Sequence, residues 1–127
     1  MKTVELIGLT NDDGADEFNP RKTLSITRGE DMTIRLTLRN PSGAFITTTG
    51  STFALTVKKK ATDSQALIAK TGTVGDGAST FTIDVADTKK LDPGRYVYDI
   101  WSTLGGKRSA VVPLSTLILE SNVVAVP

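Results

Sequence analysis

The segment "NDDGADE" gathers four carboxylates within a short span: Asp12, Asp13, Asp16 and Glu17. Clustered oxygen ligands are what a hard cation such as Ca²⁺ requires. The spacing does not match the calcium loop of EF-hand proteins, which needs carboxylates at alternate positions and a distal glutamate. Asp, Asn and Gly also form turns without any ligand. We therefore expect a solvated acidic loop and no cofactor, with a cation site as the alternative.

The segment "RYVYDIW" contains both tyrosines and the only tryptophan of the chain. Alternation along a strand divides it between two faces. One face holds Tyr96, Tyr98 and Ile100, and the other holds Arg95, Val97, Asp99 and Trp101. We expect the tyrosines to pack in the core. We expect a neighbouring segment or subunit to cover Trp101. A carbohydrate-binding platform is a more remote alternative, because it needs Trp101 and Tyr98 on one face.

The chain contains no cysteine and no histidine. It therefore cannot build a zinc site of the Cys/His kind, a cysteine nucleophile, a Ser-His-Asp triad or a histidine general base. Carboxylates such as Asp84 and Asp99 could do acid–base chemistry only if they shared a pocket, and nothing in the sequence indicates that they do. We expect no enzymatic activity.

The charge balance indicates neither nucleic acid nor membrane as a partner. The chain has fifteen basic and fourteen acidic residues, which gives a formal net charge of +1. Such a chain has no strong field for phosphates or anionic lipids. No stretch of about 18 apolar residues could span a bilayer, and we expect no signal peptide after Met1. The three lysines at residues 58–60 are typical of protected strand ends.

Alternating apolar residues predict strands in "DMTIRLTLRN", "STFALTVKKK" and "STFTIDV". Turn residues separate these runs, as in the Arg28-Gly29-Glu30 connection, where we expect Gly29 to supply a positive φ. Residues 85–92 could form one helical turn, and Pro113 should mark an edge, a bulge or a strand change. The pattern predicts an all-β fold, a single antiparallel β-sandwich of immunoglobulin-like or jelly-roll-like type, with a long N-terminal loop.

We expect one domain over residues 1–127. Within it, residues 1–22 form an N-terminal strand and an acidic loop or arm, residues 23–120 form the sandwich, and residues 121–127 form a C-terminal tail.

The order of several segments is similar to a virion domain of tailed phages. These segments are "SITRGEDMTIRLTLRNPSGAFI", "TFALTVKKK", "LIAKTGTV" and "FTIDVADTKKLDPGRYVYDIW", followed by a Gly-Gly hairpin. The chain resembles the N-terminal domain of siphophage baseplate upper proteins over about residues 24–119. The most specific motif is "DTKKLDPGRYVYDIW", and the arginine-glycine-acid turn is a second match. The segment "ITTTGST" departs from the family, whose members commonly have an Asp-Leu-Thr-Gly-Ala-like segment there.

The resemblance implies a non-enzymatic structural protein of a tailed-phage virion, assembled in the cytoplasm of the host bacterium. It favours a tail, baseplate or neck adaptor that acts by multivalent subunit packing, with capsid decoration as the alternative. Its partners would be other virion proteins, from the tail or baseplate or the major capsid protein, and further copies of itself. The candidate subunit contacts are Trp101, Arg95, Asp99, the acidic residues Asp12, Asp13, Asp16 and Glu17, and the C-terminal residues Val123, Val124 and Val126.

Overall fold

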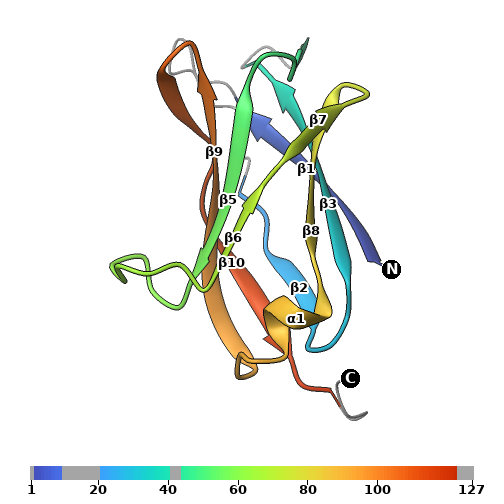
Figure 1. Ribbon diagram of the computed structural model, residues 1–127, viewed down its shortest axis with the longest axis vertical. Helices are drawn as coiled ribbons and strands as arrows, with labels where there is room; N and C mark the ends of the chain where they lie inside the picture. The colour runs from blue at the N-terminus through green and yellow to red at the C-terminus, as the bar shows by residue number, and fades with distance from the viewer. Residues whose placement is uncertain (1, 10–20, 41–43, 123–127) are drawn as a thin grey trace.

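Two β-sheets pack face to face and enclose one hydrophobic core (Figure 1). The computed structural model describes residues 2–9, 21–40 and 44–122. Its elements are β1 (Lys2–Leu9), β2 (Leu24–Thr27), β3 (Met32–Arg39), β4 (Phe45–Ile46), β5 (Thr52–Lys58), β6 (Ile68–Thr71), β7 (Thr73–Gly75), β8 (Ala78–Ile83), α1 (Val85–Thr88), β9 (Gly94–Leu104) and β10 (Lys107–Glu120). Sheet A has the order β1-β3-β8-β7, with β4 also paired to β3, and sheet B has the order β2-β10-β9-β5-β6. The predicted all-β sandwich is confirmed.

Two strand pairs run parallel, and the expectation of a purely antiparallel sandwich is wrong at these pairs. β1 is parallel to β3 in sheet A, and β2 is parallel to β10 in sheet B. The reason lies in the path of the chain. β2 joins sheet B, so the chain leaves sheet A after β1 and re-enters it at β3 in the same direction. Periodicity shows which face of a strand is buried, but it does not show which sheet the strand joins.

The predicted strand alternation fixes the core. The inward residues of β3, Met32, Ile34, Leu36 and Leu38, are all buried. Tyr96 and Tyr98 of β9 are buried as expected, at 4% and 1% exposure. Burying apolar side chains on both inner faces supplies most of the favourable free energy of such a sandwich.

One side of the sandwich is closed by the chain itself. β6 at the edge of sheet B and β7 at the edge of sheet A form one extended segment that crosses between the sheets at Gly72 (Figure 1). A Cβ atom at Gly72 would lie 2.0 Å from Ser79 Oγ and 3.0 Å from the Phe81 ring. Only glycine fits this crossing without displacing the side chain of Ser79. The opposite side, between β1 and β2, has no such connection among the described residues.

The short helix α1 is the single helical turn that the sequence predicts. Asp84 and Asp87 form a capping box, in which each side chain accepts a hydrogen bond from the main-chain N–H of the other. Lys70 Nζ of β6 lies 2.8 Å from Asp87 Oδ2. Partial burial raises the pKa of Asp87, but hydrogen bonds from Lys70 and Asp84 outweigh it and hold the pKa below its usual value.

The turn between β2 and β3 clamps α1 onto both sheets. Arg28 donates hydrogen bonds from its guanidinium to the main-chain carbonyls of Lys89 and Leu91, and to the side chain of Asn122. Gly29, at φ +91° as expected, donates its main-chain N–H to the Oγ1 atom of buried Thr88. We call these contacts the Arg28 clamp. They join the two most specific motifs of the sequence resemblance, the arginine-glycine-acid turn and the "DTKKLDPG" segment.

Replacing Arg28 with methionine tests the clamp. The change removes three charged hydrogen bonds and leaves carbonyls at the end of α1 without their donor. Hydrogen bonds to charged groups contribute about 1.5–3 kcal/mol each, and partial exposure reduces the sum. We expect the free energy of unfolding to fall by about 2–4 kcal/mol in urea titrations.

The matched control is Arg35→Met, because Arg35 forms an exposed ion pair with Glu5 at 3.3 Å. Exposed pairs contribute at most about 1 kcal/mol. Equal losses in the two variants would contradict the role given to the clamp.

The buried hydroxyl of Tyr98 makes stability depend on alkaline pH. The hydroxyl donates a hydrogen bond to the main-chain carbonyl of Lys22. Burial raises the pKa of Tyr98 to about 12, although a hydrogen bond with Ser115 lowers the pKa in part. The folded state therefore favours the neutral phenol. This contribution is complete below the ordinary tyrosine pKa of 10.0 and is lost as the pH rises toward about 12.

We expect the stability advantage of the native chain over Tyr98→Phe to narrow steadily across that alkaline range. Urea titrations at several pH values measure it. The two proteins differ at residue 98 alone, so the difference in their stabilities isolates Tyr98. A constant difference across the range would contradict the assignment.

Candidate binding surface

The outer face of sheet B presents Trp101 between two small residues. β9 lies between β5 and β10, and its odd-numbered side chains point away from the core. Trp101 pairs with Ala54 of β5 and with Ala110 of β10. The side chain of alanine is a single methyl group, which is too small to cover an indole ring. Trp101 therefore remains half-buried on the outer face of sheet B, the face on which the predicted alternation places it.

A groove of about 240 Å³ lies beside the ring. We call it the Trp101 groove, and its lining residues are Thr56, Lys58, Ala61, Val97, Tyr98, Asp99, Trp101, Arg108 and Leu114. One wall comes from an irregularity in β10. The register of β10 with β9 shifts between Ala110 and Val112 and again between Val112 and Ser115. The second shift contains Pro113, so of the edge, bulge or strand change expected there, the structure has a bulge. The second shift leaves Leu114 48% exposed, although it lies within a strand.

Polar contacts fix the indole ring in the Trp101 groove. Trp101 Nε1 donates to Asp99 Oδ2 at 3.0 Å. The guanidinium carbon of Arg108 lies 4.9 Å from the centre of the ring, within the range of a cation–π contact. The groove thus offers an apolar ring and Leu114, the donors of Arg108 and an acceptor on Asp99. This set can anchor one protruding side chain of a partner.

The structure brings together two of the predicted contact residues. Asp99 and Trp101 both line the groove. Arg95 lies on the same face of β9 but outside the groove, opposite Ile118, and its main-chain carbonyl accepts a hydrogen bond from Lys59. The other predicted contacts, Asp12, Asp13, Asp16, Glu17, Val123, Val124 and Val126, lie outside the described residues.

Sequence reasoning missed Arg108 and Leu114. The pattern places Arg108 shortly after the Gly-Gly turn, but its position opposite Thr103 depends on the register of the hairpin. The exposure of Leu114 depends on the bulges. Pro113 was the one available signal, because proline cannot donate to a ladder.

The geometry does not favour the carbohydrate-binding platform or the catalytic carboxylate pair that the sequence left as alternatives. Tyr98 is buried under the sheet, so it forms no stacking platform with Trp101. Asp84 caps α1, whereas Asp99 lies in the Trp101 groove, so the two carboxylates share no pocket.

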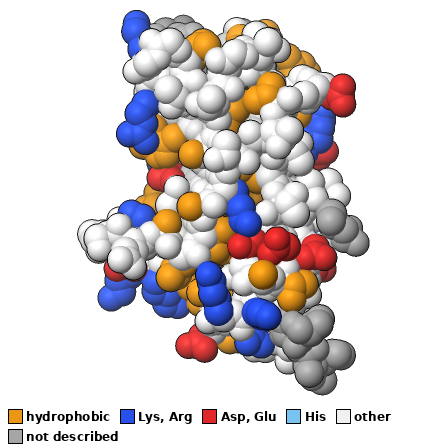
Figure 2. All heavy atoms as spheres, viewed as in Figure 1, with side chains coloured by type: hydrophobic (Ala, Val, Ile, Leu, Met, Phe, Trp, Pro, Cys, Tyr) orange, Lys and Arg blue, Asp and Glu red, His pale blue; other side chains and the backbone are white. Residues whose placement is uncertain are grey.

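Among residues 2–9, 21–40 and 44–122, no group of three or more His, Cys, Asp or Glu side chains could hold a metal ion. No helix in the described part is long and apolar enough to cross a membrane. Charged side chains of both signs are interspersed on the face shown in Figure 2.

No protein-family model and no curated protein matches the chain. Several solved structures are similar to it. The N-terminal domain of phage TP901-1 ORF48 is 12% identical at a TM-score of 0.49, over 92% of this chain and 98% of that one. Reduced auracyanin from the photosynthetic bacterium Roseiflexus castenholzii is 12% identical at a TM-score of 0.46, over 94% and 97%. The cysteine protease inhibitor EhICP2 from Entamoeba histolytica is 13% identical at a TM-score of 0.40, over 93% and 97%.

A phage domain is therefore among the structures that resemble this chain, as the sequence motifs predict. The named proteins differ widely from one another. Similarity at this level carries no argument about function, which must come from the chain's own residues.

Acrylamide quenching tests the geometry of the Trp101 groove. Trp101 is the only tryptophan of the chain, so its fluorescence reports this site alone. Replacing Arg108 with alanine removes the guanidinium from above the ring, and we expect the quenching constant to rise. Arg95→Ala is the matched control and should leave the constant unchanged. An equal response in both variants would show that Arg108 does not cover the ring.

Proposed function

We propose that the chain is a non-enzymatic structural component of a tailed-phage virion and that the Trp101 groove docks a neighbouring subunit. The observation that carries the proposal is the Arg28 clamp. The arginine-glycine-acid turn and the "DTKKLDPG" segment are the two most specific points of the sequence resemblance, and they contact each other directly. The resemblance therefore rests on one connected structural feature.

The Trp101 groove has the composition of an interface anchor. Tryptophan and arginine dominate the binding energy of many interfaces, usually from a small central pocket. Here the two residues stack, and Leu114 adds exposed apolar surface beside them. A neighbouring loop would insert one apolar side chain against Trp101 and Leu114 and present a carboxylate to Arg108. The remaining interface would come from the flat outer face of sheet B.

A small binding groove is sufficient for stable assembly when many copies of the chain bind in the same particle. A groove of about 240 Å³ accepts a single side chain, so each contact is weak by itself. A symmetric particle presents the contact many times, and linked weak contacts give an assembly far more stable than any one of them. We assign the chain to the tail, baseplate or neck, with capsid decoration as the alternative that the experiment separates.

Particle incorporation tests this function. Phage particles are produced with native or variant chain, separated into heads and tails, and assayed by quantitative mass spectrometry. We expect the native chain in the tail fraction. Trp101→Ala should lose at least about 2 kcal/mol of docking free energy, which is about 30-fold in affinity, and should be depleted from particles.

The control is Leu104→Ala, which removes a 58% exposed apolar side chain outside the groove and should leave incorporation unchanged. Recovery in the head fraction would replace the tail assignment with capsid decoration. Absence of the native chain from all fractions would overturn the virion proposal, and full incorporation of Trp101→Ala would overturn the docking role of the groove.

A further inference from the structure

A second surface lies at the open side of the sandwich, away from the Trp101 groove. β1 is an edge strand of sheet A and β2 is an edge strand of sheet B, and no other described strand pairs with their outer edges. A groove of about 350 Å³ lies between them, lined by residues 2–5 and 22–25. We call it the edge groove. The corresponding gap on the other side of the sandwich is closed by the continuous β6–β7 segment.

Two lysines bridge the edge groove. Lys2 Nζ of β1 donates to the main-chain carbonyl of Ser25 at 2.6 Å, and Lys22 Nζ donates to the main-chain carbonyl of Glu5 at 3.1 Å. These crossed contacts show that β1 and β2 run in opposite directions along the groove. The bridges are three residues apart on each strand, which is roughly 10 Å. Lys22 thereby occupies a carbonyl of β1 that an additional strand on this edge would need, and Lys2 lies across the same groove.

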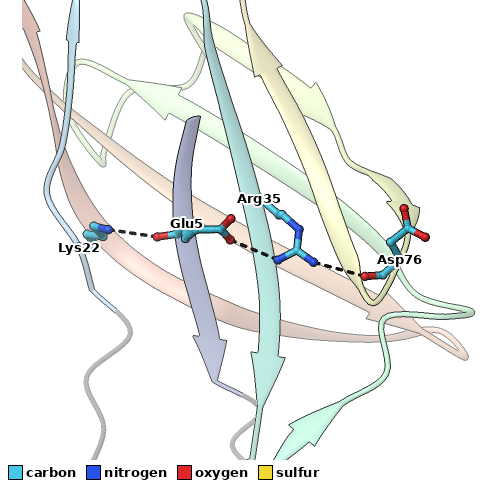
Figure 3. Close-up of polar contacts among 4 residues, drawn as sticks. All are labelled: Glu5, Lys22, Arg35 and Asp76. Atoms are coloured by element: carbon cyan, nitrogen blue, oxygen red, sulfur yellow. Dashed lines mark hydrogen bonds and ion pairs between the residues drawn. The ribbon is translucent and has the colours of Figure 1, made fainter. Parts of the chain in front are cut away.

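Glu5 is the only carboxylate among the described residues that line the edge groove, and its side chain points away from both lysines. Glu5 directs its side chain across the outer face of sheet A, where Glu5 Oε2 lies 3.3 Å from Arg35 Nη1 (Figure 3). Arg35 also donates to the main-chain carbonyl of Asp76 in the turn between β7 and β8. Glu5 is thereby held by sheet A. The other lining side chains, Thr3, Val4, Thr23, Leu24 and Ser25, are uncharged, so the groove carries a net positive charge.

We propose that the edge groove accepts an extended acidic segment of a partner protein as an additional strand. The segment would pair antiparallel with β1, which offers eight residues, whereas β2 offers four. The Glu5 carbonyl points away from β3, and main-chain groups alternate in direction along a strand, so Thr3, Glu5 and Ile7 present the free edge. Main-chain pairing gives affinity in such complexes, and side chains give specificity.

The two lysines make the groove selective for acidic strands. An uncharged strand would displace both lysines from their carbonyls and give them no new partner. A strand with two suitably placed carboxylates replaces each carbonyl contact with a charge-assisted hydrogen bond. The same lysines protect the free edges of the unbound chain from unwanted pairing. This inference concerns another surface than the virion proposal and stands independently of it.

Peptide selection against the full chain tests the proposal. A library of random dodecapeptides displayed on yeast is selected for binding, and the enriched peptides are synthesised with matched forms in which Asn and Gln replace Asp and Glu. We expect enrichment of acidic residues among β-branched ones. We expect binding to protect the amides of Thr3, Glu5 and Ile7 from hydrogen exchange and to weaken at least about tenfold in the amidated forms.

The double variant Lys2→Gln/Lys22→Gln should lose the same affinity for the acidic peptides. Lys60→Gln/Lys90→Gln changes the net charge equally at two exposed lysines outside the groove and is the matched control. Failure to enrich acidic peptides, protection at other amides, or equal loss in both double variants would overturn the proposal. Protection of the β1 amides that rises with the concentration of the chain alone would assign the groove to a second copy instead.

Discussion

The Arg28 clamp is the contact on which the arrangement of the two sheets depends. Arg28 directly follows β2 of sheet B, in the turn that leads to β3 of sheet A. Helix α1 makes the opposite crossing, from β8 in sheet A to β9 in sheet B. One guanidinium thus joins both crossings at the same end of the molecule by donating to the carbonyls that follow α1. Asp31 adds to this junction, because its side chain accepts the main-chain N–H of Val85.

The clamp lies just before β9, the strand that carries Trp101. β9 begins at Gly94, shortly after the clamped carbonyl of Leu91, and its alternation sends Tyr98 into the core and Trp101 outward. The long hairpin that Figure 1 shows brings β10 beside β9. Arg108 and Leu114 of β10 complete the lining of the groove. Because Asp99 and Arg108 hold the indole in place, the proposed docking would need little further ordering of this side chain, and its entropic cost would be small.

Much of this architecture could be predicted from the sequence because it follows local rules. The alternation in β3 and β9, the single turn of α1, the positive φ at Gly29 and the bulge at Pro113 each follow from a few neighbouring residues. The parallel pairs could not be predicted, because they depend on which sheet each strand joins. The roles of Arg108 and Leu114 could not be predicted either, because their positions depend on the cross-strand register and on the bulges of β10. The lysine bridges of the edge groove likewise connect strands that share no ladder.

Cryo-electron microscopy reconstructions of virions made with and without the gene for this chain test the proposed docking role directly. We expect density to disappear at the tail, baseplate or neck when the gene is absent. In virions that contain the chain, we expect a neighbouring subunit to cover the indole of Trp101 and the side chain of Leu114 in every copy. A virion in which the outer face of sheet B faces solvent in all copies of the chain would contradict the docking role of the Trp101 groove.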